Sequence, residues 1–204
     1  MLHLILVRHG ETEWNAQGRY HGQFDVPLSS VGRRQAERIA ERLSTQKIDV
    51  IYASDLERAW ETAAIIAAKH GLTVYAEPRL RELKFGVLEG LTFDEAQIQY
   101  PEMIAAWLKD FNRPPQGGET VDLFNARIIS LLDELKQTHD EQTLLLVGHG
   151  GSLSEILRVV LDLSRAKRCY LEMENASLSE VLIAEDYVSL KRLNDTGHLA
   201  APTL

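Results

Sequence analysis

Two short apolar runs in this sequence each end in a histidine followed by a glycine. Residues 4–7 lead into Arg8-His9-Gly10, and residues 144–147 lead into Gly148-His149-Gly150. Short runs that are apolar throughout are typical of strands covered on both faces of a parallel sheet. In an open sheet of this kind, ligands bind outside the carboxyl ends of the strands. The sequence therefore predicts that both histidines lie at one edge of one sheet and form a site.

Strand and helix patterns alternate along the rest of the chain. Strands are expected at residues 2–8, 49–53, 73–76, the run from 144, 177–183 and 188–193. Helices are expected at residues 29–43, 56–69, 92–111 with a break at Tyr100-Pro101, 120–138 and 152–161. Ser54 or Asp55 is expected to cap the second helix. The alternation predicts an α/β fold, a three-layer α/β/α sandwich with a mostly parallel central sheet.

The length of 204 residues suits one domain spanning residues 1–204. Within it, residues 78 to about 118 interrupt the alternation with an irregular segment, a Thr92–Glu95 capping box and a Pro/Gly-rich break. We interpret this segment as a small helical cap insertion over the sheet and not as a separate domain.

Composition and charge narrow the functional classes. The chain is 45% hydrophobic and 25% charged, which is ordinary for a soluble globular protein. Its net charge of -8 disfavours binding to nucleic acid or to an anionic membrane, so an anionic substrate needs a local positive pocket. A single cysteine, Cys169, and the lack of a secretory or membrane-spanning pattern predict a cytoplasmic protein. The sequence leaves a homodimer open.

The residues around the first histidine suit phosphoryl transfer. A neutral His9 can attack phosphorus and form a covalent intermediate, which divides one difficult displacement into two steps. Arg8 lies beside it and can contact phosphate oxygens in a bidentate manner. Arg58 lies in the first turn of a predicted helix, where its charge conflicts with the helix dipole unless an anion is bound there. A surface position for Arg58 is the alternative.

A phosphoryl transfer also needs a proton for the leaving alkoxide. Glu82 and Glu89 lie in the irregular segment, from which a loop can extend back over the site. A general acid of this kind contributes about 10²- to 10⁴-fold to the rate. The sequence alone identifies both carboxyl groups as candidates.

Motifs of competing chemistries are missing from the sequence. It has no Gly-x-x-x-x-Gly-Lys-Ser/Thr loop, no Gly-x-Gly-x-x-Gly turn and no Gly-x-Ser-x-Gly elbow. Its seven histidines show no spacing typical of zinc ligands. Nucleotide-dependent, serine hydrolase and zinc hydrolase functions are therefore disfavoured.

At these positions the chain resembles the histidine phosphatase superfamily, the phosphoglycerate mutase-like proteins. The matching motifs are Leu6-Val7-Arg8-His9-Gly10-Glu11-Thr12 with Trp14-Asn15, Leu28-Ser29 with Gly32, Ser54-Asp55-Leu56 with Arg58-Ala59, Leu80 with Glu82 and Gly86, and Val147-Gly148-His149-Gly150. They span residues 4–151 in the order found in the family.

The resemblance implies a role for each motif residue. His9 is expected to accept the phosphoryl group, and Glu82 to donate a proton and later to activate water. The phosphoryl group is expected to be bound by Arg8, Asn15, Arg58 and His149, with His149 protonated when ligand is bound. Glu89 is expected to be structural. No metal and no cofactor are implied.

The resemblance also suggests substrates, all of them small phosphorylated metabolites. The short cap favours a phosphatase over a phosphoglycerate mutase, and residues 80–86 are closest to the α-ribazole phosphatase form. Phosphoserine phosphatases carry histidine where Phe85 stands, and they remain an alternative. His21, Gln23 and Phe85 are the candidate substrate contacts. A phosphate-binding scaffold without catalysis is the least favoured interpretation.

Overall fold

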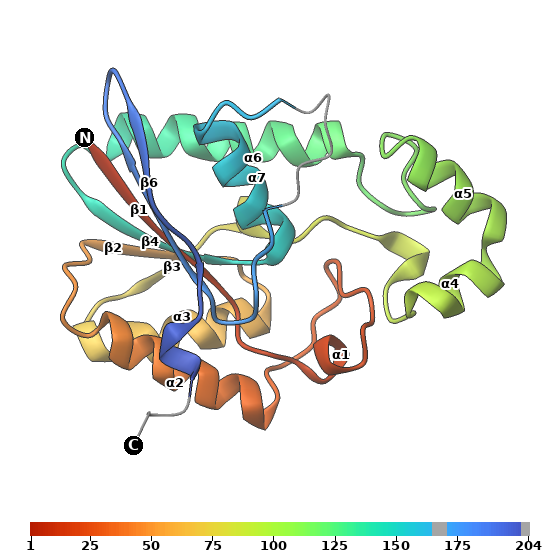
Figure 1. Ribbon diagram of the computed structural model, residues 1–204, viewed down its shortest axis with the longest axis horizontal. Coiled ribbons are helices and arrows are strands. Elements are labelled where there is room, and N and C mark those ends of the chain that lie inside the picture. The colour runs from red at the N-terminus through yellow and green to blue at the C-terminus, as the bar shows by residue number, and fades with distance from the viewer. Residues whose placement is uncertain (165–170, 201–204) are drawn as a thin grey trace.

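A mixed six-stranded sheet forms the centre of the molecule, with helices on both faces (Figure 1). The computed structural model describes residues 1–164 and 171–200, so Cys169 lies outside the described residues. Across the sheet the strands follow the order β3 (Val74–Ala76), β2 (Val50–Ala53), β4 (Thr143–Gly148), β1 (Leu2–Arg8), β5 (Leu178–Ile183) and β6 (Val188–Asp195). The first four run parallel, and β5 and β6 are antiparallel to their neighbours. The predicted α/β sandwich is confirmed, with a sheet that is mixed at one edge.

Alternating side chains of β1 anchor the two helical layers. Leu4 and Leu6 pack with α6 (Val121–Thr138) and α7 (Gly150–Val160), whereas Ile5 and Val7 pack with α2 (Ser30–Leu43) and α3 (Glu57–His70). All four side chains are at most 1% exposed. Burying each one contributes about 1.5–3 kcal/mol, which explains why this strand has no polar face.

Helix starts differ from the predictions at two places. Thr92 accepts a backbone N–H at the start of its helix, as its capping box predicted, and Ser29 and Thr120 cap two other helices in the same way. The predicted cap of α3 was wrong, because Leu56 occupies the N-cap position and makes no side-chain hydrogen bond there. The helix α7 begins at Gly150 and not at residue 152, since tertiary contacts hold a glycine pair that helix propensity disfavours.

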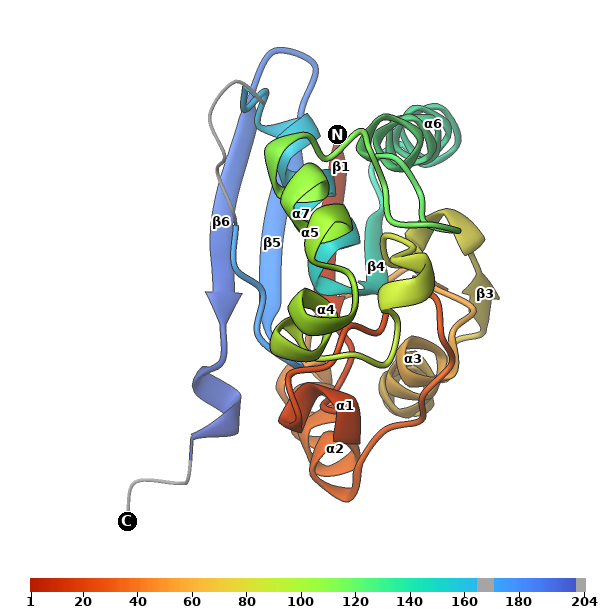
Figure 2. The same cartoon turned by 90° about the vertical axis from the view of Figure 1, so that its right-hand side faces the viewer.

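Residues 78–118 lie beyond the carboxyl ends of the parallel strands and form short helices (Figure 1). These are η1 (Pro78–Leu80), η2 (Gly86–Leu88), α4 (Phe93–Gln99) and α5 (Pro101–Lys109). Figure 2 shows α4 and α5 in front of the sheet, while α1 (Glu13–Ala16) lies below them. A separate apolar cluster around Leu88, Ile104 and Trp107 holds this segment together.

At the end of the described chain, η3 (Gly197–Leu199) packs against α2, and the Arg38 guanidinium donates to the carbonyl of Leu199. Within residues 1–164 and 171–200, no helix combines the length and apolar character needed to cross a membrane.

Candidate active site

The strand register brings the two histidine motifs together. Because β1 and β4 are parallel neighbours with Arg8 opposite Gly148, the next residues of both strands, His9 and His149, leave the sheet side by side. Their ring centroids are 5.1 Å apart. Ser54 follows the neighbouring strand β2 and donates its backbone N–H to Val147. Three strand ends therefore meet at one point of the sheet edge, as the sequence predicted for the histidines.

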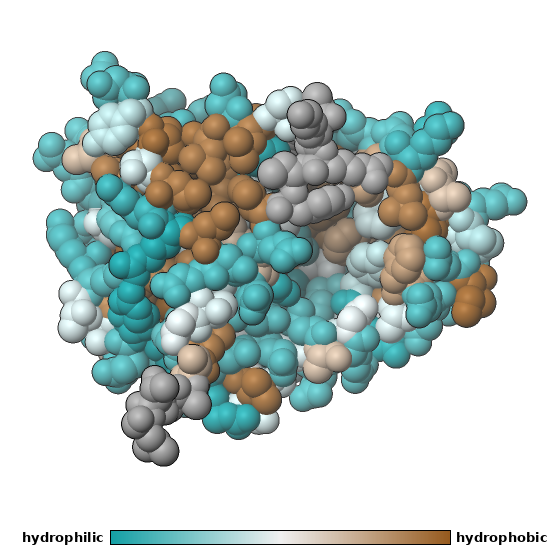
Figure 3. All heavy atoms as spheres, viewed as in Figure 1, coloured by the Kyte–Doolittle hydropathy of each residue, from teal (hydrophilic) through white to brown (hydrophobic). Residues whose placement is uncertain are grey.

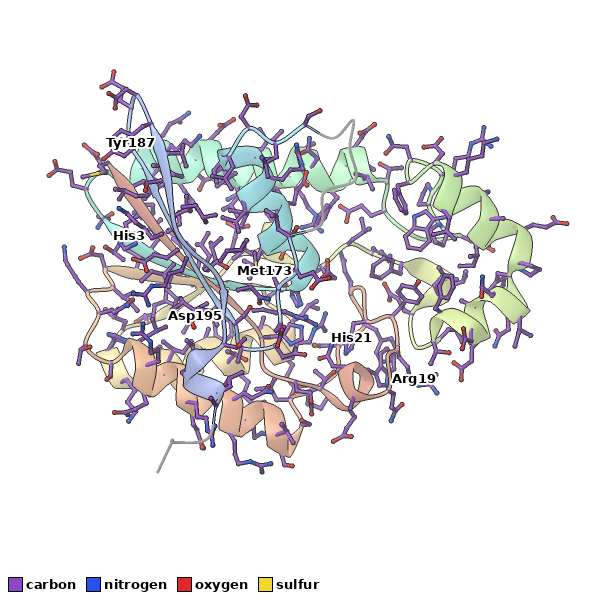
Figure 4. All side chains as sticks on the ribbon, viewed as in Figure 1. His3, Arg19, His21, Met173, Tyr187 and Asp195 are labelled. Atoms are coloured by element: carbon purple, nitrogen blue, oxygen red, sulfur yellow. The ribbon has the colours of Figure 1, made fainter. Side chains whose placement is uncertain are left out.

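A cavity of about 180 Å³ opens at this point. Its lining includes eight of the nine predicted site residues, namely Arg8, His9, Asn15, His21, Arg58, Glu82, Phe85 and His149. Arg19, Tyr20 and Gly22 complete the lining, which does not include Gln23. Figure 4 shows His21 and Met173 toward the middle of the molecule, with Arg19 further out beside α1.

His9 is held in the form needed for nucleophilic attack. Its Nδ1 lies 2.7 Å from the Gly10 carbonyl oxygen, which can only accept a hydrogen bond, so Nδ1 carries the proton. The other nitrogen, Nε2, then keeps its lone pair. Burial and the charges of Arg58 and Arg8 hold the pKa of His9 well below 6.5, so the ring is neutral at physiological pH.

Glycine at position 10 lets this loop approach α2 closely. A Cβ atom built on Gly10 would lie 2.3 Å from the backbone oxygen of Gly32. The Gly10 N–H donates to the Thr62 hydroxyl at 3.1 Å, and the His9 carbonyl accepts from the Ala176 N–H at 3.1 Å. His9 is thus fixed through its backbone as well as its ring.

Arg58 is fully buried, contrary to the surface alternative. Its two terminal nitrogens donate to the carbonyls of Phe24 at 2.9 Å and Gly22 at 2.8 Å. These bonds orient the guanidinium without neutralising its charge. Burial lowers the pKa of Arg58 to about 10, so it is cationic at neutral pH.

Three buried nitrogen atoms around the cavity have no hydrogen-bond partner among the described residues. They are Nε of Arg8, Nε of Arg58 and Nδ1 of His149, and all three residues line the cavity. The two arginine nitrogens are N–H donors, and Nδ1 of His149 is a donor in the tautomer whose Nε2 accepts from the Ser54 hydroxyl. A buried donor without an acceptor costs about 1–3 kcal/mol for a neutral group and more for a charged one. An anion in the cavity would supply the acceptors.

Asn15 is oriented by contacts that occupy its oxygen. Its Oδ1 lies 3.0 Å from the Thr12 backbone nitrogen and 3.3 Å from Nδ2 of Asn175, both of which donate to it. The amide Nδ2 of Asn15 is therefore the group available to a ligand. Asn175 also donates to the His9 carbonyl at 3.1 Å, so one side chain supports both residues.

His149 contacts a residue that the sequence assigned to another role. Its Nε2 lies 2.9 Å from the hydroxyl of Ser54, which was expected to cap α3. Burial, together with the nearby Arg58, holds the pKa of His149 well below 6.5. The ring is neutral in the unliganded protein, and its protonation with ligand bound stays a prediction.

Glu82 reaches the cavity from the segment before η2. Its Oε1 accepts from the Leu83 N–H at 2.8 Å, and its Oε2 accepts from the Gly151 N–H at 2.9 Å. A Cβ at position 151 would lie 2.1 Å from Oε1, so a larger residue there would displace the carboxylate. The other candidate acid, Glu89, accepts from the backbone of Gln23 and Phe85 at 3.0 Å each, which fits the structural role expected for it.

The candidate substrate contacts differ in position. His21 and Phe85 line the cavity, whereas the Gln23 side chain donates to the Glu82 carbonyl at 3.1 Å. Tyr20, which sequence reasoning missed, lies 5.0 Å from Phe85 between ring centroids. Its only sequence signal was its place beside His21 in a long loop. Asn175 had no signal, because it follows no motif and is placed by the fold alone.

The buried histidines predict a specific dependence of stability on pH. In the unfolded chain each imidazole binds a proton near pH 6.5, whereas burial lowers the pKa of His21 to about 4 and those of His9 and His149 well below 6.5. The unfolded state therefore binds more protons below pH 6.5. The free energy of unfolding should fall as pH is lowered from 7 to 5, by at most about 1.4 kcal/mol per pH unit for each histidine.

Urea unfolding at pH 7, 6 and 5 measures this slope. The variant His21→Gln should show a smaller slope than the native chain, because one buried imidazole is gone. Saturating phosphate should raise stability at each pH. An identical slope in the variant and the native chain would contradict the assignment of His21.

Comparisons with known proteins agree with this geometry. Residues 4–196 match the model of the histidine phosphatase superfamily, branch 1. The chain is 36% identical to phosphoserine phosphatase 1 of Hydrogenobacter thermophilus over 98% of this chain and 95% of that protein. It is 38% identical to a probable phosphoglycerate mutase of Yersinia pestis over 100% and 98% of the two chains.

The fold is also similar to that of solved structures. A putative α-ribazole-5'-phosphate phosphatase from Escherichia coli superposes with a TM-score of 0.89 at 28% identity, covering 95% of this chain and 96% of that one. The two histidine motifs, the arginines and the matched residues together lead to one assignment. The chain belongs to branch 1 of the histidine phosphatase superfamily and is an enzyme of the phosphoric monoester hydrolase kind.

Proposed function

We propose that this enzyme is a metal-independent phosphatase of small phosphomonoesters that works through a phosphohistidine at His9. One observation carries the proposal: a neutral His9 lies in a cavity where three buried nitrogen atoms, from Arg8, Arg58 and His149, have no partner among the described residues. A phosphoryl group in the cavity would accept from these nitrogens while His9 attacks it. Asn15 would add a fourth donor.

In the first step, Nε2 of His9 forms a bond to phosphorus as the ester P–O bond breaks. Glu82 in its acid form gives its proton to the leaving oxygen, which departs as an alcohol. The arginines stabilise the charge on the equatorial oxygens of the transferred group. Because the Nδ1–H of His9 donates to the Gly10 carbonyl, the positive charge that develops on the ring is stabilised.

In the second step, the Glu82 carboxylate takes a proton from a water molecule whose oxygen attacks the phosphohistidine. The P–N bond breaks and inorganic phosphate is released. His9 returns to its neutral form, and Glu82 carries the proton needed for the next cycle.

The walls of the cavity favour a leaving group with a flat or apolar part. Tyr20 and Phe85 form its aromatic side and continue into Trp107 of the cap. Arg19 also lines the cavity, but Glu95 binds its guanidinium at 2.6 and 3.2 Å. We therefore propose α-ribazole 5'-phosphate as the leading substrate.

Two further activities are favoured by the relatives. The relative from Hydrogenobacter thermophilus carries the name phosphoserine phosphatase 1, and that from Yersinia pestis the name probable phosphoglycerate mutase. Phosphoserine and phosphoglycerate carry a carboxylate, which needs a cation besides those that bind the phosphoryl group. Hydrolysis of phosphoserine and interconversion of phosphoglycerates are therefore the two alternative activities to test.

Phosphate release in excess chelator, measured with p-nitrophenyl phosphate, phosphoserine, 3-phosphoglycerate and α-ribazole phosphate, tests the proposal. We expect chelator-resistant release that is lost in His9→Ala, with the largest kcat/KM for α-ribazole phosphate. The best substrate in the panel decides between the phosphatase assignments. Interconversion of 2- and 3-phosphoglycerate without net release would favour the mutase.

Loss of release in chelator, with recovery on adding a metal, would overturn the metal-independent mechanism. Binding of phosphate or vanadate with no release from any ester would favour the non-catalytic scaffold.

The proposal also includes a cytoplasmic location and a homodimer. The single cysteine supports a reducing compartment. The outer edge strand β6 exposes Val188, Leu190 and Leu193 by 39–41%, and Figure 3 shows apolar side chains gathered near β6 and the end of α7. Light scattering on the purified protein distinguishes a monomer from a dimer.

A further inference from the structure

Two side chains from opposite sides meet at the backbone carbonyl of the candidate acid. Nε2 of Gln23 donates to the Glu82 carbonyl oxygen at 3.1 Å, and Nη2 of Arg127 donates to the same oxygen at 3.0 Å. Gln23 belongs to the loop after the first histidine motif, and Arg127 belongs to α6. Both lone pairs of this oxygen are therefore occupied.

Arg127 is itself held in one orientation. Its Nε and Nη2 donate to the two carboxylate oxygens of Glu119 at 2.9 and 3.0 Å, and its Nη1 donates to the carbonyl of Arg79. The guanidinium carbon lies 4.5 Å from the centroid of the Phe124 ring. The paired side chains are only 17% and 15% exposed. A bidentate pair with this little exposure is geometrically specific, unlike a single surface ion pair.

The segment that carries Glu119 also packs against the loop that follows Glu82. The Glu119 N–H donates to the Lys84 carbonyl at 2.9 Å. Gly86 adopts a positive φ of 57°, and a Cβ there would lie 2.1 Å from the Gln116 carbonyl oxygen. These contacts hold the chain after Glu82, and the hydrogen bond from Arg127 to the Arg79 carbonyl holds the chain before it.

This anchoring matters because the Glu82 carboxylate has few other constraints. One of its two backbone donors, Leu83, belongs to the same loop and moves with it. The other donor is the N–H of Gly151 in the first turn of α7, and it connects the carboxylate to the helix that follows β4. Where the carboxyl lies relative to His9 thus depends on where the loop backbone is held.

We propose that Arg127, oriented by Glu119, is a positioning residue that holds the general acid Glu82 over the phosphoryl site. The proposal rests on the acid role given to Glu82 in the proposed function. It assigns a kinetic role to residues 117–120, with the sequence Gly-Gly-Glu-Thr, and to α6, neither of which lines the cavity. An error of about 1 Å in the position of a catalytic group can cost about 100-fold in rate.

The test compares kcat/KM for a simple alkyl phosphate with kcat/KM for p-nitrophenyl phosphate. An alkoxide needs a proton to leave, whereas p-nitrophenolate does not. Arg127→Ala should lower kcat/KM about 10- to 100-fold for the alkyl ester and about threefold or less for the aryl ester. Arg127→Lys and Glu119→Gln should show smaller losses with the same selectivity, and they keep the test informative if Arg127→Ala does not fold.

Combination with the acid variant separates positioning from general destabilisation. In Glu82→Gln the proton donor is already lost, so adding Arg127→Ala should lower kcat/KM for the alkyl ester little further. Arg158→Ala is the matched control, because Arg158 forms a similarly buried pair with Glu155 in α7, 19% and 10% exposed. Its variant should show no selectivity between the esters.

Equal losses on both esters in the Arg127 variants, or full additivity with Glu82→Gln, would overturn the positioning role. These outcomes are distinct from failure of the proposed function. If release by the native enzyme does not depend on His9, the phosphohistidine mechanism fails whatever the Arg127 variants show.

Discussion

Replacing His9 by alanine should abolish phosphate release from every ester, a loss of at least about 1,000-fold in kcat. In the proposed mechanism the Nε2 atom of His9 is the one that attacks phosphorus, and the variant lacks it. The fold should persist, because the His9 ring packs against cavity residues and not within the two main apolar clusters. Steady-state release and thermal unfolding of the purified variant measure both effects.

His139→Ala is the control for the loss of a histidine. His139 lies at the end of α6, where its ring contacts Tyr52 and Gln142. That variant should keep native turnover. Turnover within about tenfold of native in His9→Ala would contradict the phosphohistidine mechanism, since removal of the attacking atom leaves no covalent route.

Replacing Glu82 by glutamine should separate the two chemical steps. For an alkyl phosphate, kcat/KM should fall about 10²- to 10⁴-fold, because the leaving alkoxide receives no proton. For p-nitrophenyl phosphate, kcat/KM should change about threefold or less, because it reports the first step and this leaving group needs no acid. Its kcat should still fall, since water attack on the phosphohistidine lacks its base.

Because hydrolysis of the phosphohistidine should be slow in Glu82→Gln, the covalent intermediate should accumulate enough to be detected. Rapid mixing of Glu82→Gln with p-nitrophenyl phosphate should give a burst of nitrophenolate close to one equivalent per His9, followed by slow release of phosphate. Intact-protein mass measurement during the burst should show the added phosphoryl group. Equal losses in kcat/KM for both esters, with no burst, would argue against both roles of Glu82.

Much of the fold could be predicted because local patterns and tertiary packing agree. The run at residues 4–7 is apolar throughout, which is typical of a strand covered on both faces, and β1 is such a strand. The Thr92 capping box begins α4 through hydrogen bonds that span only a few residues, and Pro101 begins α5 through its fixed φ. Signals of this range are complete in the sequence itself.

Prediction was weaker where a side chain had two competing partners. Serine is a residue type that often caps helices, but the hydroxyl of Ser54 contacts His149, which lies 95 residues further along the chain. Asp55, the other predicted cap, forms an ion pair with Arg81. A local hydrogen bond and a distant one differ little in energy, so only the tertiary structure decides between them.

By itself the sequence determined the strand ends that carry Arg8, His9 and His149, because buried apolar runs and glycines fix them locally. The tertiary structure alone decided the tautomer of His9, the burial of Arg58 and the use of Asn175 and Arg127 as supports. These depend on contacts between residues far apart in the chain. Such contacts form only once packing removes water and leaves each buried polar group a limited choice of partners.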